Sequence, residues 1–456
     1  MASLERAREL AEAGELDKAW KVVDAVLQEN VDDPKALILA TFILEKAGRI
    51  TVAYHLAKRL TELYPQQCVA WINLGRCADE LWRIEESFQC YEKALALAKT
   101  PDLKCTANVN MSALLVQVGR FREVIKYAQA ALEVNPENLK ARHNLGVAFL
   151  AERRWHEGWT LYSASLGSPQ RIMWKYGDEP TWKGEGGTVV VYGEQGIGDE
   201  INAASMVPDA IKAAGRVILD CDPRLANLYR RSFPAAKVYG TRTKSAVEWD
   251  PEDQKIDASI SSMELGGLFR LKDEDFPGTP YLVADPERVA MWRSLFERKR
   301  KPVIGIAWSG GVPQSGAKFR KMALEDLMPV FKAISAHWVC LQYKDAEEEV
   351  AAVRKRGVDI VQYPYATLTN DYDDTAALVA ACDRVLCMQT AVAHLAGALG
   401  KECQVFLPQN SQWRYGESGD QTLWYNSVRL IRQSRRGEWK GPILMAADLL
   451  QEKEAA

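Results

Sequence analysis

One short segment combines a glycine-rich turn with a carboxylate, and it is the clearest place for chemistry in this chain. The run TVVVYGEQGIGDE, residues 188–200, begins as an apolar stretch typical of a buried strand and turns at glycines before Asp199. An apolar, alanine-rich segment follows and predicts a helix. Such a junction leaves backbone N–H groups unpaired at the carboxyl end of a sheet, where α/β folds bind phosphates. Asp199 is therefore a candidate reaction centre, and the turn supplies Gly193, Gln195, Gly196 and Gly198.

A second strand-to-helix junction lies near the carboxyl end of the chain. The apolar run RVLCM leads into QTAVAHLAGALG, residues 389–400, whose first helical turn offers Thr390 and backbone N–H groups. This junction is also suited to a phosphate. Of the five histidines, His394 alone falls at an expected strand end. Because a lone histidine in a helix is more often packed in a core, a ligand role and a packing role both stay open.

Strands and helices alternate from Thr188 onward, which predicts parallel, doubly wound sheets. Two such domains of similar size would face a cleft between them. In the first domain we expect strands at 188–192, 217–220, 237–239 and 257–261, and helices at 199–214 and 223–232. A charged helix at 286–299 leads to the second domain, with strands at 303–307, 337–342, 359–362, 384–388 and 403–407 and helices at 324–335 and 390–399.

The first 170 residues repeat themselves. Glycines at 14, 48 and 119 predict turns between paired helices. Pro65 and Pro136, with Pro34 and Pro101 close to the equivalent places, predict where the second helix of a pair ends. A period of about 34 residues with two amphipathic helices per unit resembles the tetratricopeptide repeat. Five repeats would stack into a right-handed superhelix with a concave groove. The period is read from small or polar residues spaced by 34, 34, 37 and 34 positions, namely Ala7, Thr41, Gly75, Ser112 and Gly146.

In three consecutive repeats an asparagine stands two residues before the small or polar residue that marks the period, at Asn73, Asn110 and Asn144. In tetratricopeptide repeats that position faces the concave surface. A row of amides there could exchange hydrogen bonds with the backbone of an extended peptide, which would make it an acceptor groove for a protein partner. The alternative is that these asparagines pack neighbouring helices together. Both interpretations stay open.

Composition limits the class of protein and its partners. The chain has 456 residues, is 47% hydrophobic and carries a net charge of −3, without the basic excess of a nucleic-acid binder. No apolar run approaches the ~18 residues of a membrane span. The nine cysteines show no metal-ligand spacing, so we expect reduced thiols in a cytoplasmic protein. The expected domains are a repeat array at 1–167, a linker at 168–187, a first α/β lobe at 188–299 and a second at 300–456.

The α/β motifs together resemble one known family. They are GEQGIGD, WSGG (308–311), DDTAALVAACD (373–383), TAVAHLAGALG and WYNSVRLIRQ (424–433). The chain is similar over nearly its whole length to bacterial tetratricopeptide-repeat proteins whose carboxyl-terminal region resembles the ADP-heptose lipopolysaccharide heptosyltransferases. It resembles the O-linked N-acetylglucosamine transferases more remotely. The resemblance implies the two-lobed GT-B fold and a metal-independent glycosyltransferase. Its donor would be a nucleotide-diphosphate sugar, with no other cofactor, and its acceptor a hydroxyl, including one on a polypeptide held by the repeats.

The resemblance also assigns roles to residues. Asp199 corresponds to the family's candidate general base, which would take the acceptor proton. Arg320 falls where a basic residue meets the donor diphosphate, with Lys318 and Lys321 as neighbours, and such cations would offset charge on the leaving group. The remaining residues expected at the donor are Ser309, Gln389, Thr390, Ala391 and His394.

Departures from the family pattern keep rival interpretations open. Gln389 stands where the family has an aspartate, which puts the identity of the donor in question and favours a non-catalytic adaptor with a degenerate transferase fold. A dinucleotide oxidoreductase would use Asp220, 22 residues beyond Gly198, to bind a ribose, although the glycines are not spaced as G-x-G-x-x-G. The acidic run DYDD, residues 371–374, favours a helix cap over a metal site.

Overall fold

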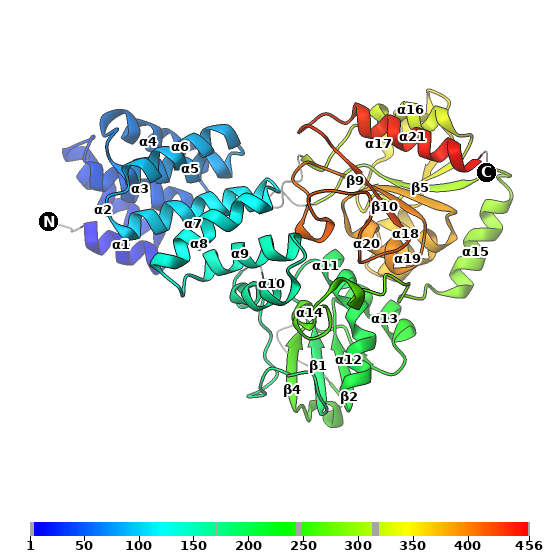
Figure 1. The fold of residues 1–456 in the computed structure, drawn as a ribbon. Coiled ribbons are helices and arrows are strands. Elements are labelled where there is room, and N and C mark those ends of the chain that lie inside the picture. Colours follow the sequence, from blue (N-terminus) through cyan, green and yellow to red (C-terminus); the bar gives the residue numbers. More distant parts are fainter. Residues whose placement is uncertain (1–3, 170, 243–248, 312–318, 455–456) are drawn as a thin grey trace. The chain divides into compact units, whose positions relative to one another are not determined.

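The structure is a computed structural model that describes residues 4–169, 171–242, 249–311 and 319–454. The chain divides into two compact units, Met1–Phe149 and Leu150–Ala456. The described part of the first unit is entirely helical, and the second contains two parallel sheets with surrounding helices (Figure 1).

The amino-terminal region is a tetratricopeptide-repeat superhelix, as its period predicts. Helices α1 to α8 pack as four consecutive pairs, and each pair also contacts the next (Figure 1). Helices α9 and α10 continue the repeat, although α10 belongs to the second compact unit. The ten helices are α1 (Leu4–Glu12), α2 (Leu16–Glu29), α3 (Pro34–Lys46), α4 (Ile50–Leu63), α5 (Cys68–Glu80), α6 (Ile84–Leu97), α7 (Pro101–Gln117), α8 (Phe121–Val134), α9 (Leu139–Ala151) and α10 (Trp155–Tyr162).

The small residues that mark the repeat lie where the two helices of a pair approach. Ala7, Thr41 and Ser112 are fully buried. A β-carbon at Gly75 would overlap the ring of Tyr91 from the second helix of its pair. The period in the sequence therefore follows the spacing of close helix contacts, where only a small side chain fits.

The turns inside the pairs need a left-handed backbone. Gly14, Gly48 and Gly119 have φ values of +84°, +73° and +75°, which glycine adopts without steric cost. At the equivalent turns of the other two pairs, Trp82 and Arg153 hold φ values of 57° and 60°. These turns form without glycine because the hydrogen bonds that end the helix are still made. At Trp82, for example, the next residue Arg83 donates its N–H to the carbonyl of Ala78 at 2.8 Å.

Prolines occur on both sides of the connections between pairs. Pro65 and Pro136 follow the ends of α4 and α8, as expected. Pro34 and Pro101 instead occupy the first turns of α3 and α7, where a missing N–H costs nothing. The Asp33 and Thr100 side chains cap these two helices.

The first sheet is parallel with the order β3-β2-β1-β4. The connections reverse direction between β1 and β4, which is the position where open α/β sheets bind ligands. Its strands are β1 (Thr188–Tyr192), β2 (Arg216–Asp220), β3 (Lys237–Tyr239) and β4 (Ala258–Ser261). Its helices are α11 (Ile197–Ala203), α12 (Val207–Ala213), α13 (Ala226–Ser232) and α14 (Gly266–Phe269).

The second sheet is parallel with the order β10-β9-β8-β5-β6-β7. Counted from β5, this is the 3-2-1-4-5-6 order of doubly wound nucleotide-binding folds, with the reversal between β5 and β8. The strands are β5 (Val303–Ala307), β6 (His337–Cys340), β7 (Ile360–Gln362), β8 (Arg384–Met388), β9 (Cys403–Leu407) and β10 (Val428–Arg432). The helices are α15 (Pro286–Glu297), α16 (Met328–Ala333), α17 (Glu347–Arg354), α18 (Pro364–Thr367), α19 (Tyr372–Ala381), α20 (Ala391–Ala398) and α21 (Lys440–Glu454).

The segment expected as a linker has no helix or strand in its described residues but covers the free edge of the first sheet. The Trp182 N–H donates to the carbonyl of Ser259 at 3.0 Å, and the Ser259 N–H donates to the carbonyl of Pro180 at 3.0 Å. These bonds use backbone groups of β4 that would otherwise be exposed at an edge. In the described part of the chain, every helix is too short or too polar to cross a membrane.

The turn geometry predicts the effect of replacing Gly48. A β-carbon there meets no atom within 4 Å, so Gly48→Ala changes only the backbone energy. We expect the substitution to lower the free energy of unfolding of the repeat unit by about 1–2 kcal/mol, because alanine resists a φ of +73°. Urea denaturation followed by helical circular dichroism measures this. Gly48→Asn is the matched control and should cost less, because asparagine tolerates the left-handed region. Equal losses for the two variants would contradict the explanation.

Candidate active site

The glycine turn after β1 places Asp199 in the first turn of α11. The Gly193 N–H donates to the carbonyl of Asp220 at 3.0 Å, which ties the start of the turn to the end of β2. Gly196 is the residue before the helix, and its carbonyl accepts from the Glu200 N–H at 3.0 Å. The side-chain oxygen Gln195 Oε1 is buried and has no hydrogen-bond partner among the described residues.

Helix α11 of the first lobe packs against α20 of the second lobe. A β-carbon at Gly198 would lie 3.1 Å from Ala391 Cα and 3.4 Å from His394 Cδ2. The glycine therefore allows the two helix starts to meet with almost no side chain between them. The two junctions singled out in the sequence are brought together by this contact.

Asp199 forms an ion pair across this contact. Its Oδ1 lies 2.8 Å from Arg414 Nη2, and Arg414 follows β9 in the second lobe. The Arg414 side chain is only 3% exposed, whereas that of Asp199 is 26% exposed. The carboxylate is thus held from one side by a buried cation and open to solvent on the other.

His394 is buried directly behind this pair and bonds to two tyrosines. Its Nδ1 lies 3.0 Å from the Tyr425 hydroxyl, and its Nε2 lies 3.4 Å from the Tyr415 hydroxyl. Burial, together with the nearby Arg414 cation, lowers the pKa of His394 to about 3, and Asp199 opposes the shift. The imidazole is therefore neutral at physiological pH and supports the site by hydrogen bonding.

Tyr425 joins His394 to the first lobe. The Asn202 amide of α11 donates to the Tyr425 hydroxyl at 3.0 Å. The Tyr281 hydroxyl lies 3.4 Å from that of Tyr425 and donates to the carbonyl of Ile201 at 2.8 Å. Sequence reasoning did not identify Arg414, Tyr415, Asn202 or Tyr281.

Arg320 lies beside the glycines that follow β5. The Gly310 N–H donates to the carbonyl of Arg320 at 3.1 Å, and a β-carbon at Gly311 would overlap the Arg320 guanidinium. Burial lowers the pKa of Arg320, while Tyr415 and Asp199 oppose that shift. A β-carbon at Gly310 would also overlap the side chain of Thr390. The loops after β5 and β8 thus meet at the reversal of the second sheet.

The remaining residues that the sequence predicts at a donor lie in the same loops. Thr390 caps α20, and its hydroxyl oxygen accepts from the Val392 N–H at 3.3 Å. Gln389 is 2% exposed, and its Oε1 has no partner in the described part of the chain. Ser309 is buried, and its hydroxyl oxygen accepts from Gln342. Lys318 lies outside the described residues.

Behind Asp199, the neighbouring Glu200 belongs to a buried charged cluster. Glu200 Oε2 lies 2.7 Å from Arg242 Nε, and its Oε1 accepts from the Asp222 N–H at 2.9 Å. Burial raises the pKa of Glu200 to about 7, although Arg242 opposes the shift. These contacts hold the first turn of α11 through the residue that follows Asp199.

The three asparagines Asn73, Asn110 and Asn144 each lie in the first helix of a repeat. Asn73 and Asn144 are buried, and the Asn144 amide donates to the Ser112 hydroxyl at 2.9 Å. That bond joins consecutive repeats, as the packing alternative requires for Asn144. Asn110 is half-buried, and its Nδ2 has no partner among the described residues.

Asp220 and Asp371, considered above for ribose and metal binding, both accept hydrogen bonds from other residues of the chain. Asp220 Oδ2 accepts from the Tyr176 hydroxyl at 2.8 Å, and its Oδ1 accepts from Thr241. A ribose would have to displace these bonds. Asp371 caps α19 by accepting from the Asp373 N–H at 3.1 Å, which confirms the capping interpretation. Across the described residues, no three His, Cys, Asp or Glu side chains form a metal-binding group.

Comparison with known protein families agrees with the repeat assignment. The tetratricopeptide repeat family matches residues 69–101. Protein FlbA of Caulobacter vibrioides is 28% identical over 440 residues, which cover 91% of this chain and 72% of FlbA. The tetratricopeptide repeat-containing protein trd-1 of Caenorhabditis elegans is 37% identical over 86 residues, 19% of this chain and 11% of trd-1. A solved tetratricopeptide-repeat protein of Thermus thermophilus aligns with a TM-score of 0.32 and 18% identity, over 36% of this chain and 89% of that protein.

The buried imidazole predicts an acid-dependent loss of stability. The pKa of His394 falls from 6.5 to about 3 on folding, so its contribution is complete above pH 6.5 and is lost as the pH falls toward 3. We expect this to remove about 2 kcal/mol between pH 6.5 and 5. Urea midpoints followed by tryptophan fluorescence should show that His394→Gln has a shallower acid slope than the parent. Tyr425→Phe keeps the imidazole and should retain the slope. An unchanged slope in His394→Gln would refute the assignment.

Proposed function

We propose that this chain is a glycosyltransferase that moves a sugar from a nucleotide-diphosphate donor to a hydroxyl acceptor, with a protein partner bound by its repeats. The observation that supports this most strongly is the meeting of two strand-to-helix junctions, one from each parallel sheet, at Asp199 and Arg414. Each junction lies at a carboxyl edge suited to ligands. The proposed architecture is the two-lobed GT-B arrangement.

In this proposal Asp199 is the general base. Arg414 occupies Oδ1 and fixes the carboxylate, so Oδ2 is left to take the proton of the acceptor hydroxyl. As that proton moves, the acceptor oxygen forms a bond to the anomeric carbon, and the bond from this carbon to the phosphate oxygen breaks. The electron pair leaves with the nucleoside diphosphate.

The donor diphosphate would bind at the reversal of the second sheet. Arg320 supplies positive charge, and the first turn of α20, beginning at Ala391 after Thr390, supplies backbone N–H groups. The unpaired acceptor Gln389 Oε1 suits a hydroxyl or amide of the donor, which would donate a hydrogen bond to it. A neutral glutamine in this position would select donors differently from an aspartate.

A second candidate is a non-catalytic adaptor that binds partners through its repeats. Its support is the ion pair itself, because a carboxylate bound to a buried guanidinium can serve as an interlobe lock rather than a base. The glycosyltransferase and the adaptor predict different rates of sugar turnover but the same nucleotide binding.

Asp199→Asn separates them. We expect the variant to keep its affinity for nucleoside diphosphate within about threefold and to lose at least about a hundredfold in turnover, because the base is lost while the turn persists. Calorimetry with ADP, CDP, GDP and UDP measures binding, and release of diphosphate from the matching sugar donor measures turnover. Asp178→Asn, the same change at an exposed residue, should leave both unchanged. Full turnover in Asp199→Asn would exclude the general base, and no turnover in the parent with any donor would favour the adaptor.

Arg320→Ala tests the donor site. We expect Kd for the nucleoside diphosphate to rise roughly tenfold or more, because a charge-assisted hydrogen bond contributes about 1.5–3 kcal/mol. Arg320→Lys should recover part of the affinity, since it restores the charge but not the two-pronged geometry. The exposed Arg298→Ala is the control, and calorimetry is the measurement. An unchanged Kd in Arg320→Ala would place the diphosphate elsewhere.

A further inference from the structure

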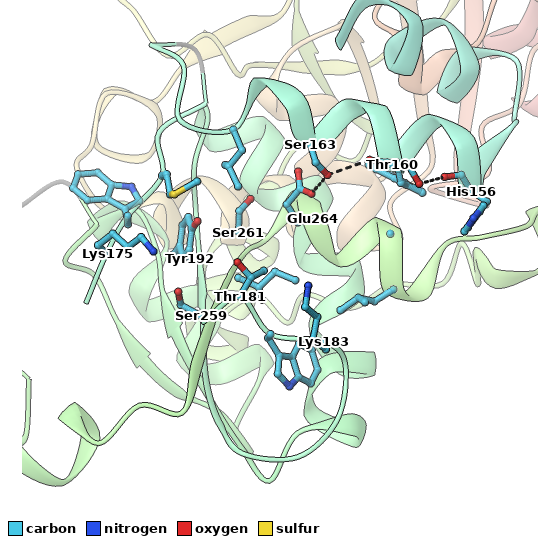
Figure 2. A pocket seen from close by; sticks show the side chains of 18 residues that line it. His156, Thr160, Ser163, Lys175, Thr181, Lys183, Tyr192, Ser259, Ser261 and Glu264 are labelled. Atoms are coloured by element: carbon cyan, nitrogen blue, oxygen red, sulfur yellow. Dashed lines mark hydrogen bonds between the residues drawn. The ribbon is translucent and has the colours of Figure 1, made fainter. Parts of the chain in front are cut away.

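The first lobe contains a second concave site, separate from Asp199 and its partners. It is a cavity of about 380 Å³, within the size range of small-ligand sites, roughly 300–1,000 Å³. Its walls come from the carboxyl halves of β1 and β4, from α10, and from residues 173–183 (Figure 2). It therefore opens at the reversal between β1 and β4, where the first sheet is suited to bind a ligand.

Aromatic rings and hydroxyl groups share the walls. Trp174, Trp182 and Tyr192 contribute aromatic surface, and the Trp174 indole N–H is buried without an acceptor among the described residues. Ser259 and Ser261 add hydroxyls, labelled in Figure 2 beside Tyr192. Aromatic surface beside closely spaced hydrogen-bonding groups matches the alternating C–H and O–H groups of a sugar ring.

One wall carries a fixed carboxylate. Glu264 accepts from the Ser163 hydroxyl (Figure 2). Glu264 also pairs with Arg171, which binds Glu194 at 2.8 Å. Arg171 is 1% exposed and its guanidinium lies 4.0 Å from the Tyr162 ring centre. Because these contacts hold Glu264 in place, its carboxylate is a preorganised acceptor for ligand hydroxyls.

The rim is positively charged. Lys175 and Lys183 are exposed, and no acidic partner for either exists in the described part of the chain. In Figure 2 the Lys175 amine points toward Tyr192, and the Lys183 amine points toward the side of the pocket where Glu264 lies. Two ammonium groups above a hydroxyl-rich wall favour a ligand that carries an anionic group.

We propose that this cavity binds an acidic monosaccharide, with its ring against Trp174 and Trp182 and its carboxylate or phosphate between Lys175 and Lys183. The inference stands on this cavity alone and does not require that the chain transfer sugars.

Saturation-transfer NMR and tryptophan fluorescence test this with three probes at up to about 10 mM, which detects millimolar Kd values. The probes are glucuronate, glucose 6-phosphate and uncharged glucose. At least one acidic sugar should bind about tenfold more tightly than glucose. Binding of glucuronate alone would assign a carboxylate, and binding of glucose 6-phosphate alone a phosphate.

Variants of the whole chain locate the binding. Lys175→Gln with Lys183→Gln should weaken the acidic sugar at least about tenfold, and Trp174→Phe should reduce the fluorescence change. Lys212→Gln with Lys255→Gln, two exposed lysines of the same lobe, is the matched control and should bind as the parent does. Asp199→Asn should also bind as the parent does, which separates this site from the proposed transferase site. No binding by any probe, equal binding of glucose, or equal loss in the control pair would overturn the proposal.

Discussion

The ion pair between Asp199 and Arg414 is the interaction on which the candidate active site depends. It joins the first turn of α11 to the loop after β9, and so connects the two lobes of the α/β unit. Arg414 is almost fully buried, so removal of its partner would leave a desolvated cation, a change that typically costs several kcal/mol. The pair forms because Gly198 lets α11 approach α20 to van der Waals distance. A side chain at that residue would move the carboxylate away.

Hydrogen bonding around His394 makes this arrangement rigid. A neutral imidazole has one donor and one acceptor nitrogen, and both are used by tyrosine hydroxyls. Protonation would place a second positive charge beside the Arg414 cation in a buried site, so burial and Arg414 both lower the pKa of His394. Tyr425 extends the network to Asn202 of the first lobe. The neutral histidine thus supports the charged pair and does not compete with Arg414 for the Asp199 carboxylate.

Much of the fold could be predicted from the sequence, and the reasons for the differences are local. All nine expected strands are present, because apolar runs flanked by glycine or charged residues are typical of buried parallel strands. Strand β10 was not expected, since arginines interrupt VRLIR. The helix expected at 199–214 is divided into α11 and α12 by a short 3-10 segment, with Pro208 in the first turn of α12. The site could be predicted only in part: strand ends identified Asp199, Thr390 and His394, whereas Arg414 and Tyr415 lie in a loop without periodicity and meet the site only through the folded chain.

Both parallel sheets reverse their strand order, and the two reversals present different chemistry. The second-sheet reversal holds Arg320, glycines and the start of α20, a set that can contact a diphosphate through charge and backbone N–H groups. The first-sheet reversal holds aromatic rings, hydroxyls and a fixed carboxylate, which suit a sugar ring and not a polyphosphate. Glu194, in the Asp199 turn, binds the same Arg171 that holds Glu264. The cavity wall and the turn that carries Asp199 therefore share one buried arginine.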